Sequence, residues 1–128
     1  METIKGENSG INSSALIATV SGVDLNVTTK SNLFTVPTGK TLVVSRVTVR
    51  NASTSLTTAS FGFGFNASAN DVVTASLHTM LVDNTLYEIV IPITGSKIGN
   101  ASDVLGVKCS IAQGVAATVT IDVFGYLV

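Results

Sequence analysis

Hydrophobic and polar residues alternate most clearly in residues 42–50 of this 128-residue chain. A Pro-Thr-Gly turn at residues 37–39 precedes the stretch, and Asn51 follows it. A period of two residues is typical of a β-strand that buries one face. That period places Val43, Val47 and Val49 on one face, and Val44, Arg46, Thr48 and Arg50 on the other. We therefore expect a half-buried strand whose two arginines point the same way.

Short segments of the same kind recur along the chain from residue 15 onward, each bounded by Gly, Pro, Asn or Ser. The expected strands are residues 15–20, 23–29, 32–36, 41–50, 57–66, 86–92, 103–112 and 116–127. Residues 70–81 fit a short helix about as well as a strand, so their structure stays open. This spacing is typical of a sandwich or a barrel, and we expect an all-β, single-domain antiparallel β-sandwich over residues 15–128. Strand count alone does not separate a jelly roll from an immunoglobulin-like sandwich.

Two segments add detail to this prediction. In Phe61-Gly62-Phe63-Gly64-Phe65, aromatic rings alternate with residues that have no side chain. The glycines leave one face of the strand bare, which favours close approach by another part of the chain. Pro92 ends an apolar segment, and a proline fits the end of a strand or an edge strand but no central one.

The last expected strand changes character near its end. Its outer face is polar up to Asp122 and then carries Phe124, Tyr126 and Val128. One interpretation is that loops of the same domain cover this end. The other is a subunit interface, because exposed aromatic residues on a sheet often mark a partner surface.

Residues 1–14 are polar and without periodicity, and we expect them to form a flexible N-terminal arm with Ile4 and Ile11 as its apolar residues. The arm lacks the apolar core of a secretory signal, so synthesis in a cytoplasm is expected. No segment is long and apolar enough to suggest a membrane span.

Charged residues make up only 12% of the chain, about half the usual share, and the formal net charge is −1. This balance offers no field that would attract nucleic acid or an anionic membrane. Lys40, Arg46 and Arg50 could still form a local cationic strip for a partner that carries carboxylates, or they could simply be solvated.

Residues suited to catalysis or ligand binding do not form a recognisable set. Gly39-Lys40-Thr41 lacks the preceding glycine of a phosphate-binding loop, because Phe34 occupies that position. His78 is the one histidine and Cys109 the one cysteine, and the carboxylates are scattered singly. We expect Cys109 to be a core side chain and His78 a partly exposed one. The sequence therefore predicts no catalytic residue, no cofactor and no metal site.

One segment resembles a sequence found in structural proteins of tailed-phage virions. It is Phe34-Thr35-Val36-Pro37-Thr38-Gly39-Lys40-Thr41, followed by the alternating strand to Asn51. The small Ser/Thr/Val/Gly-rich β domain with a polar arm looks like the jelly-roll decoration, or cement, proteins of phage capsids. The resemblance implies a jelly roll, a homotrimer on the capsid surface of the virion, and the major capsid protein as partner.

From this resemblance we expect a structural protein that bridges neighbouring capsid subunits. The candidate interface residues are Ile4, Ile11, Arg46, Arg50, Phe124 and Tyr126. The alternative is a receptor- or carbohydrate-binding head of a phage tail or fibre, which would use loops such as residues 66–71 and 94–100. An enzyme is the third and most distant interpretation.

Overall fold

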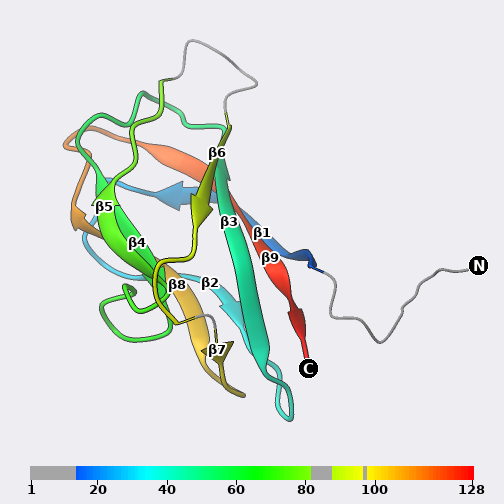
Figure 1. Ribbon diagram of the computed structural model, residues 1–128. Coiled ribbons are helices and arrows are strands. Elements are labelled where there is room, and N and C mark those ends of the chain that lie inside the picture. The colour runs from blue at the N-terminus through cyan, green and yellow to red at the C-terminus, as the bar shows by residue number, and fades with distance from the viewer. Residues whose placement is uncertain (1–13, 82–87, 97) are drawn as a thin grey trace, which may run out of the picture.

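The computed structural model describes residues 14–81, 88–96 and 98–128, and within them it contains strands and no helix. The nine strands are β1 (Ala15–Asp24), β2 (Ser31–Thr35), β3 (Leu42–Arg50), β4 (Ser60–Gly64), β5 (Val73–Leu77), β6 (Glu88–Pro92), β7 (Ile98–Gly99), β8 (Val104–Ile111) and β9 (Thr118–Leu127). They form two antiparallel sheets that face each other (Figure 1). The predicted single-domain β-sandwich is confirmed.

The first sheet has the order β1-β9-β3-β6, with β7 also paired to β3, and the second has the order β2-β8-β4-β5. The pairs are nested along the chain. Thus β1 pairs with β9, β2 with β8, β3 with β6, and β4 with β5. A long hairpin of eight strands wrapped into two sheets gives this order, and such an order is compatible with a jelly roll.

The core lies between the two sheets and consists of the inward-facing residues of nearly every strand. Phe61 and Phe63 on β4 are fully buried, and their ring centroids lie 6.0 Å apart in an edge-to-face arrangement. Such aromatic pairs add about 0.5 to 1.5 kcal/mol beyond the apolar area they bury. Cys109 is buried in the same core, as expected.

A β-bulge in β3 corrects the predicted faces of this strand. Val44 pairs with Gly125, and Arg46 pairs with Phe124, so Ser45 is an extra residue on the β3 side. Before the bulge, the even-numbered Val44 is buried, whereas after it the odd-numbered residues are. Val43 therefore lies on the outer face, opposite to the prediction, because a strict period of two does not continue through a bulge.

The strand boundaries differ from the prediction in three further places. Residues 15–20 and 23–29 are not two strands, because β1 continues to Asp24 through an irregularity at Gly22, whose φ is +69°. Residues 25–29 form a loop. In the ambiguous segment, residues 73–77 form the edge strand β5, and the two-residue β7 was not predicted. Pro92 does end an edge strand, as its sequence position indicated.

The bare face of β4 receives other parts of the backbone, as predicted. A Cβ atom on Gly62 would lie 2.4 Å from the carbonyl oxygen of Val73, and one on Gly64 would lie 2.7 Å from the amide nitrogen of Asn70. These distances leave no room for a side chain. The alternating glycines therefore let β5 and the loop before it pack directly on β4.

The loops at one end of the sandwich meet at Gln113, which is 8% exposed. Its Oε1 accepts hydrogen bonds from the backbone N–H groups of Thr57, Thr58 and Ala59, at 3.2, 3.1 and 3.0 Å. One side chain thus satisfies three consecutive backbone donors, of which the N–H of Ala59 is buried and the other two are partly buried. It fixes the loop before β4 against the loop after β8.

We predict that Gln113→Leu will lower the free energy of unfolding by about 2 kcal/mol or more, because a buried donor left without an acceptor costs about 1 to 3 kcal/mol. Gln113→Glu keeps an acceptor for the three N–H groups and should retain most of the stability at neutral pH. Urea unfolding followed by circular dichroism measures both variants. Equal stability of the leucine variant and the original chain would contradict this role.

Candidate interaction surface

The exposed side of the β1-β9-β3-β6 sheet, here called the outer face, brings together residues that are distant in sequence. Directly opposite residues of antiparallel strands share a face. Leu16 on β1 lies opposite Phe124 on β9, and Phe124 lies opposite Arg46 on β3. These three residues form one row across the sheet.

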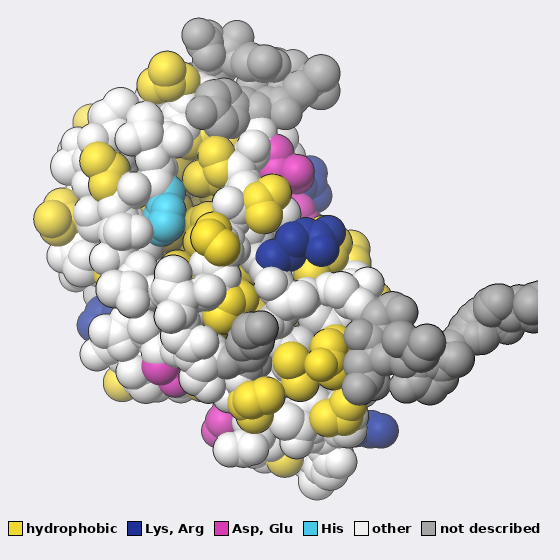
Figure 2. Space-filling model, viewed as in Figure 1, with side chains coloured by type: hydrophobic (Ala, Val, Ile, Leu, Met, Phe, Trp, Pro, Cys, Tyr) yellow, Lys and Arg dark blue, Asp and Glu magenta, His cyan; other side chains and the backbone are white. Residues whose placement is uncertain are grey.

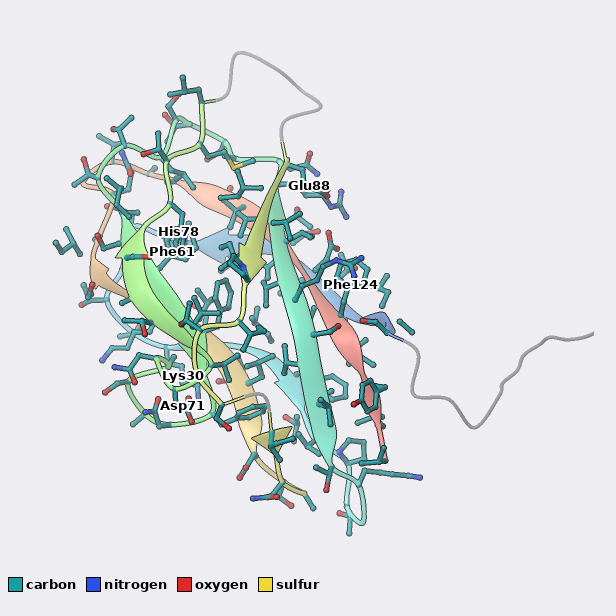
Figure 3. All side chains as sticks on the ribbon, viewed as in Figure 1. Lys30, Phe61, Asp71, His78, Glu88 and Phe124 are labelled. Atoms are coloured by element: carbon teal, nitrogen blue, oxygen red, sulfur yellow. The ribbon has the colours of Figure 1, made fainter. Side chains whose placement is uncertain are left out.

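Arg46 is the cationic centre of this row. Its guanidinium carbon lies 3.9 Å from the centroid of the Phe124 ring, which is a cation–π contact. Figure 3 labels Phe124 on strand β9. In the part of the chain that the structure describes, Arg46 has no hydrogen bond or ion pair. The ring therefore holds the guanidinium in place, and no described residue accepts a hydrogen bond from its N–H groups.

Apolar side chains surround this pair. Tyr126 lies opposite Val43, and Val43 lies opposite Ile98. Ile98 is 48% exposed, Val90 on β6 is 58% exposed, and Leu16 is 55% exposed. Figure 2 shows hydrophobic side chains gathered on this side of the molecule next to a cationic one. A cation among aromatic and aliphatic side chains is the composition typical of protein–protein contacts.

Arg50, the second predicted cation, is paired within the sheet. Its Nε donates to Asp122 at 2.8 Å, and the same carboxylate accepts from Thr48 Oγ1 at 3.0 Å and from Thr19 Oγ1 at 2.8 Å. The side chain of Asp122 is 8% exposed. The predicted strip of Lys40, Arg46 and Arg50 is therefore not a continuous row of free cations, because Asp122 neutralises Arg50 and Lys40 lies in the turn before β3.

The same network lowers the pKa of the Asp122 carboxyl below its ordinary value of 3.8, chiefly through the hydrogen bond from Arg50 and despite the opposing effect of burial. The pKa of Arg50 is raised by the same pair. A carboxyl whose pKa falls on folding stabilises the fold above its unfolded pKa and loses this contribution as the pH falls through the folded pKa.

We predict that Asp122→Asn destabilises the chain at pH 7 and that the difference from the original chain shrinks as the pH drops below about 4, near the ordinary pKa of Asp. Urea midpoints measured between pH 7 and pH 2.5 test this. Asp24→Asn is a suitable control, because Asp24 lies at the end of β1 and its side chain bonds only the nearby backbone N–H of Asn26 among the described residues. A difference that does not depend on pH would contradict the pairing.

The structure places four of the six predicted interface residues. Arg46, Phe124 and Tyr126 lie together on the outer face, and Arg50 lies on the same face but is paired. Ile4 and Ile11, with all but the last residue of the expected arm, lie outside the described residues. The sequence alone does not place Leu16, Val43, Val90 and Ile98 on this face, because their position there depends on strand pairing and bulges.

Among the described residues, His78 and Cys109 each contact a backbone carbonyl oxygen of another segment. His78 directly follows β5, and its Nε2 lies 3.2 Å from the carbonyl oxygen of Phe61 and 3.3 Å from Ser76 Oγ (Figure 3). Burial lowers the pKa of the His78 ring, and it raises the pKa of the Cys109 thiol to about 11. Across residues 14–81, 88–96 and 98–128, no three His, Cys, Asp or Glu side chains are grouped as metal ligands.

A second feature is a polar recess of about 360 Å³ by the second sheet. It is lined by Thr28, Ser68, Asn70, Ala75, Lys108, Cys109 and Ser110. Nearby, Lys30 Nζ donates to the carbonyl oxygens of Phe65, Asn66 and Val104, at 3.2, 3.2 and 2.8 Å, and so fixes the loop that carries Ser68 and Asn70. Within the described ranges, no aromatic side chain lines this recess.

Comparison with known proteins finds a structural likeness without a sequence family. No protein-family model matches the chain, and no curated protein matches it. A chain of the solved structure titled "Cyanophage Pam1 capsid asymmetric unit" has a TM-score of 0.57 and 15% identity, and the match covers 98% of this chain and 93% of that chain. At this identity the likeness shows a shared fold. No helix long and apolar enough to cross a membrane occurs among the described residues.

Proposed function

We propose that this chain is a structural protein of a phage virion that decorates the capsid and binds across neighbouring major capsid protein subunits. The observation that carries the proposal is the shared fold over nearly the full length of both chains with a chain of a cyanophage capsid asymmetric unit. The outer face supports it with a ring-stacked cation, unpaired among the described residues, in an apolar surrounding. The virion is thus the proposed location, and the capsid subunits are the proposed partners.

Bridging explains how such a protein stabilises a shell. A subunit bound across a junction must be released before the neighbouring capsid subunits separate, so its binding free energy adds to the stability of the shell. Several modest contacts linked in one oligomer can raise the effective affinity by about 10² to 10⁴. This mode of binding suits a surface that presents Arg46, unpaired among the described residues, and a few apolar side chains better than it suits a single deep pocket.

We expect Arg46→Gln and Phe124→Ser each to weaken attachment to purified capsid shells by roughly tenfold or more, since arginine and aromatic anchors at interfaces are often worth about 2 kcal/mol. Co-sedimentation with shells that lack the protein measures the affinity. Lys108→Gln is the matched control, because it removes a cation from the other sheet. If Arg46→Gln and Lys108→Gln bind as well as the original chain, the outer face is not the contact.

A second prediction concerns the arm. Deletion of residues 2–12 should leave the urea midpoint of the domain unchanged and reduce occupancy on the capsid, because a linked contact is lost while the strands stay intact. Occupancy is measured by gel densitometry of purified particles. Unchanged occupancy would show that the arm does not take part in attachment.

The proposal includes a homotrimer, since an oligomer supplies the several linked contacts that bridging needs. Analytical ultracentrifugation of the purified chain is expected to give three times the mass of 13.1 kDa. A monomer at all concentrations, found only at the tail in images of the particle, would overturn the preferred function.

A receptor- or carbohydrate-binding head is the second candidate, and the polar recess by the second sheet is the observation that favours it. Hydroxyl and amide groups with one lysine could bind sugar hydroxyls, although sugar sites in proteins commonly also offer an aromatic face. A glycan array separates the two candidates. Specific glycan binding that is lost in Asn70→Ala, with no binding to capsid shells, would favour the head domain.

A further inference from the structure

The polar recess by the second sheet is lined by side chains that can donate hydrogen bonds, and one of these is a lysine. Its volume of about 360 Å³ lies at the lower end of the range of about 300 to 1,000 Å³ that is usual for small-molecule sites. The residues that line it all belong to the part of the chain that the structure describes. The donors and acceptors of this lining decide which ligands fit it.

Lys108 is the cation of the recess. It lies on β8 between the core residues Val107 and Cys109, so its own side chain points to the opposite face of the sheet. Directly across from it on β4 is Gly62, which has no side chain. Lys108 is partly buried, and no described residue accepts a hydrogen bond from its ammonium group or forms an ion pair with it. A partly buried cation without such a partner favours a ligand that supplies negative charge.

The Asn70 side chain adds a donor, because its oxygen already accepts a hydrogen bond. The backbone N–H of Asn70 donates to Asn66 Oδ1 at 3.1 Å, which fixes the orientation of the Asn66 amide. Asn66 Nδ2 then donates to Asn70 Oδ1 at 2.9 Å. The Nδ2 group of Asn70 has no acceptor among the described residues. It is therefore available to a ligand in the recess.

The hydroxyl groups of Thr28 and Ser68 are two more donors of the lining. Neither is hydrogen-bonded to a described residue, whereas the Ser110 hydroxyl donates to the carbonyl oxygen of Ser60 at 3.3 Å. The lining thus offers more donors than acceptors. A carboxylate or phosphate oxygen accepts hydrogen bonds and needs no acceptor in return, whereas a neutral sugar hydroxyl both donates and accepts. This balance favours an anion over a neutral sugar.

Hydrogen bonds hold the loop of residues 66–71 in place beside the recess. Lys30 Nζ donates to three backbone carbonyl oxygens, including that of Phe65 at 3.2 Å. Asp71 Oδ1 accepts from the backbone N–H of the same residue at 2.8 Å, and Figure 3 labels both Lys30 and Asp71. A loop that is fixed in this way loses little conformational entropy when a ligand binds.

Lys30 also adds a second positive charge on this face of β8. A Cβ atom on Gly106 would lie 2.4 Å from Lys30 Cε, and Gly106 shares its face of the strand with Lys108. The hydrogen-bond partners of Lys30 are neutral carbonyls, and no described carboxylate pairs with either lysine. Asp24 and Asp71 do not line the recess, and their carboxylates accept from backbone N–H groups. The recess therefore presents positive charge to a ligand.

We propose that this recess binds the carboxylate or phosphate group of an acidic sugar, with Lys108 as the charged anchor and with Thr28, Ser68 and Asn70 as hydrogen-bond donors. The two groups share the chemistry of an oxyanion, which forms short, charge-assisted hydrogen bonds. The site lies on the sheet opposite the outer face, so it does not depend on the proposed capsid contact, and the two can fail separately.

A matched set of sugars tests the need for charge. In titrations followed by amide NMR, glucuronate and glucose-6-phosphate should shift the signals of Ser68, Asn70 and Lys108 with a dissociation constant on the order of 1 mM. Glucose should bind at least about tenfold more weakly, a difference equivalent to about 1.4 kcal/mol. Tighter binding of one acidic sugar assigns the site to carboxylate or to phosphate, and either result supports the proposal. Glucose that binds as tightly as glucuronate would overturn it.

Three variants locate the site. Lys108→Gln should weaken the binding of both acidic sugars by about tenfold or more, whereas Arg46→Gln, which removes a cation from the other sheet, should leave it unchanged. Asn70→Asp keeps the oxygen that accepts from Asn66 and replaces the amide donor by a carboxylate oxygen, so it should abolish binding while the loop stays intact. Urea midpoints show whether each variant is folded.

Two results of the variant titrations would contradict the site. One is an equal loss of affinity in Lys108→Gln and Arg46→Gln, which would mean that the acidic sugars respond only to the total charge of the chain. The other is the absence of shifts around the recess in the original chain with both acidic sugars. Loss of sugar binding in Lys108→Gln together with unchanged attachment to capsid shells would support this site and leave the outer face as the capsid contact.

Discussion

The surface around Arg46 depends on one β-bulge. Leu42 and Val44 point into the core, so a regular strand would also direct residue 46 inward. Ser45 adds one residue on the β3 side and turns Arg46 outward onto the ring of Phe124. Without this extra residue the fold would have to bury an unpaired guanidinium, at a cost of several kcal/mol. The bulge therefore allows β3 to supply the core with valines and the outer face with a cation.

Much of the architecture could be predicted from local sequence. Turn residues around short alternating segments were enough to predict the sandwich, the start of β3 after the Pro-Thr-Gly turn, and the edge position of Pro92. The alternating glycines of β4 predicted the close approach of other backbone. These features succeed because each is decided by the backbone needs of a few neighbouring residues.

The rest depends on pairing between distant residues. From the sequence, Gly22 suggested a break between two strands. β1 instead continues through it, because β9 offers pairing partners to the residues before Gly22 and to those after it. The pairing of Arg50 with Asp122 joins residues 72 positions apart, so the sequence could not show that this arginine is neutralised. The sequence named Arg46, Phe124 and Tyr126 as interface candidates, but the exposed apolar residues beside them, Val43, Val90 and Ile98, come from β3, β6 and β7, whose register no local pattern shows.

The nested pairing of strands has a consequence for biosynthesis. β9 follows all the other described strands in the chain, yet it occupies the middle of its sheet, between β1 and β3. Until β9 has been synthesised, β1 lacks its partner in this sheet and β3 is paired only on its β6 and β7 side, so the first sheet closes only after β9 emerges from the ribosome. Contacts of such long range make folding slow relative to helical proteins of this size. The edges of β1 and β3 that pair with β9 are open to aggregation until β9 is in place.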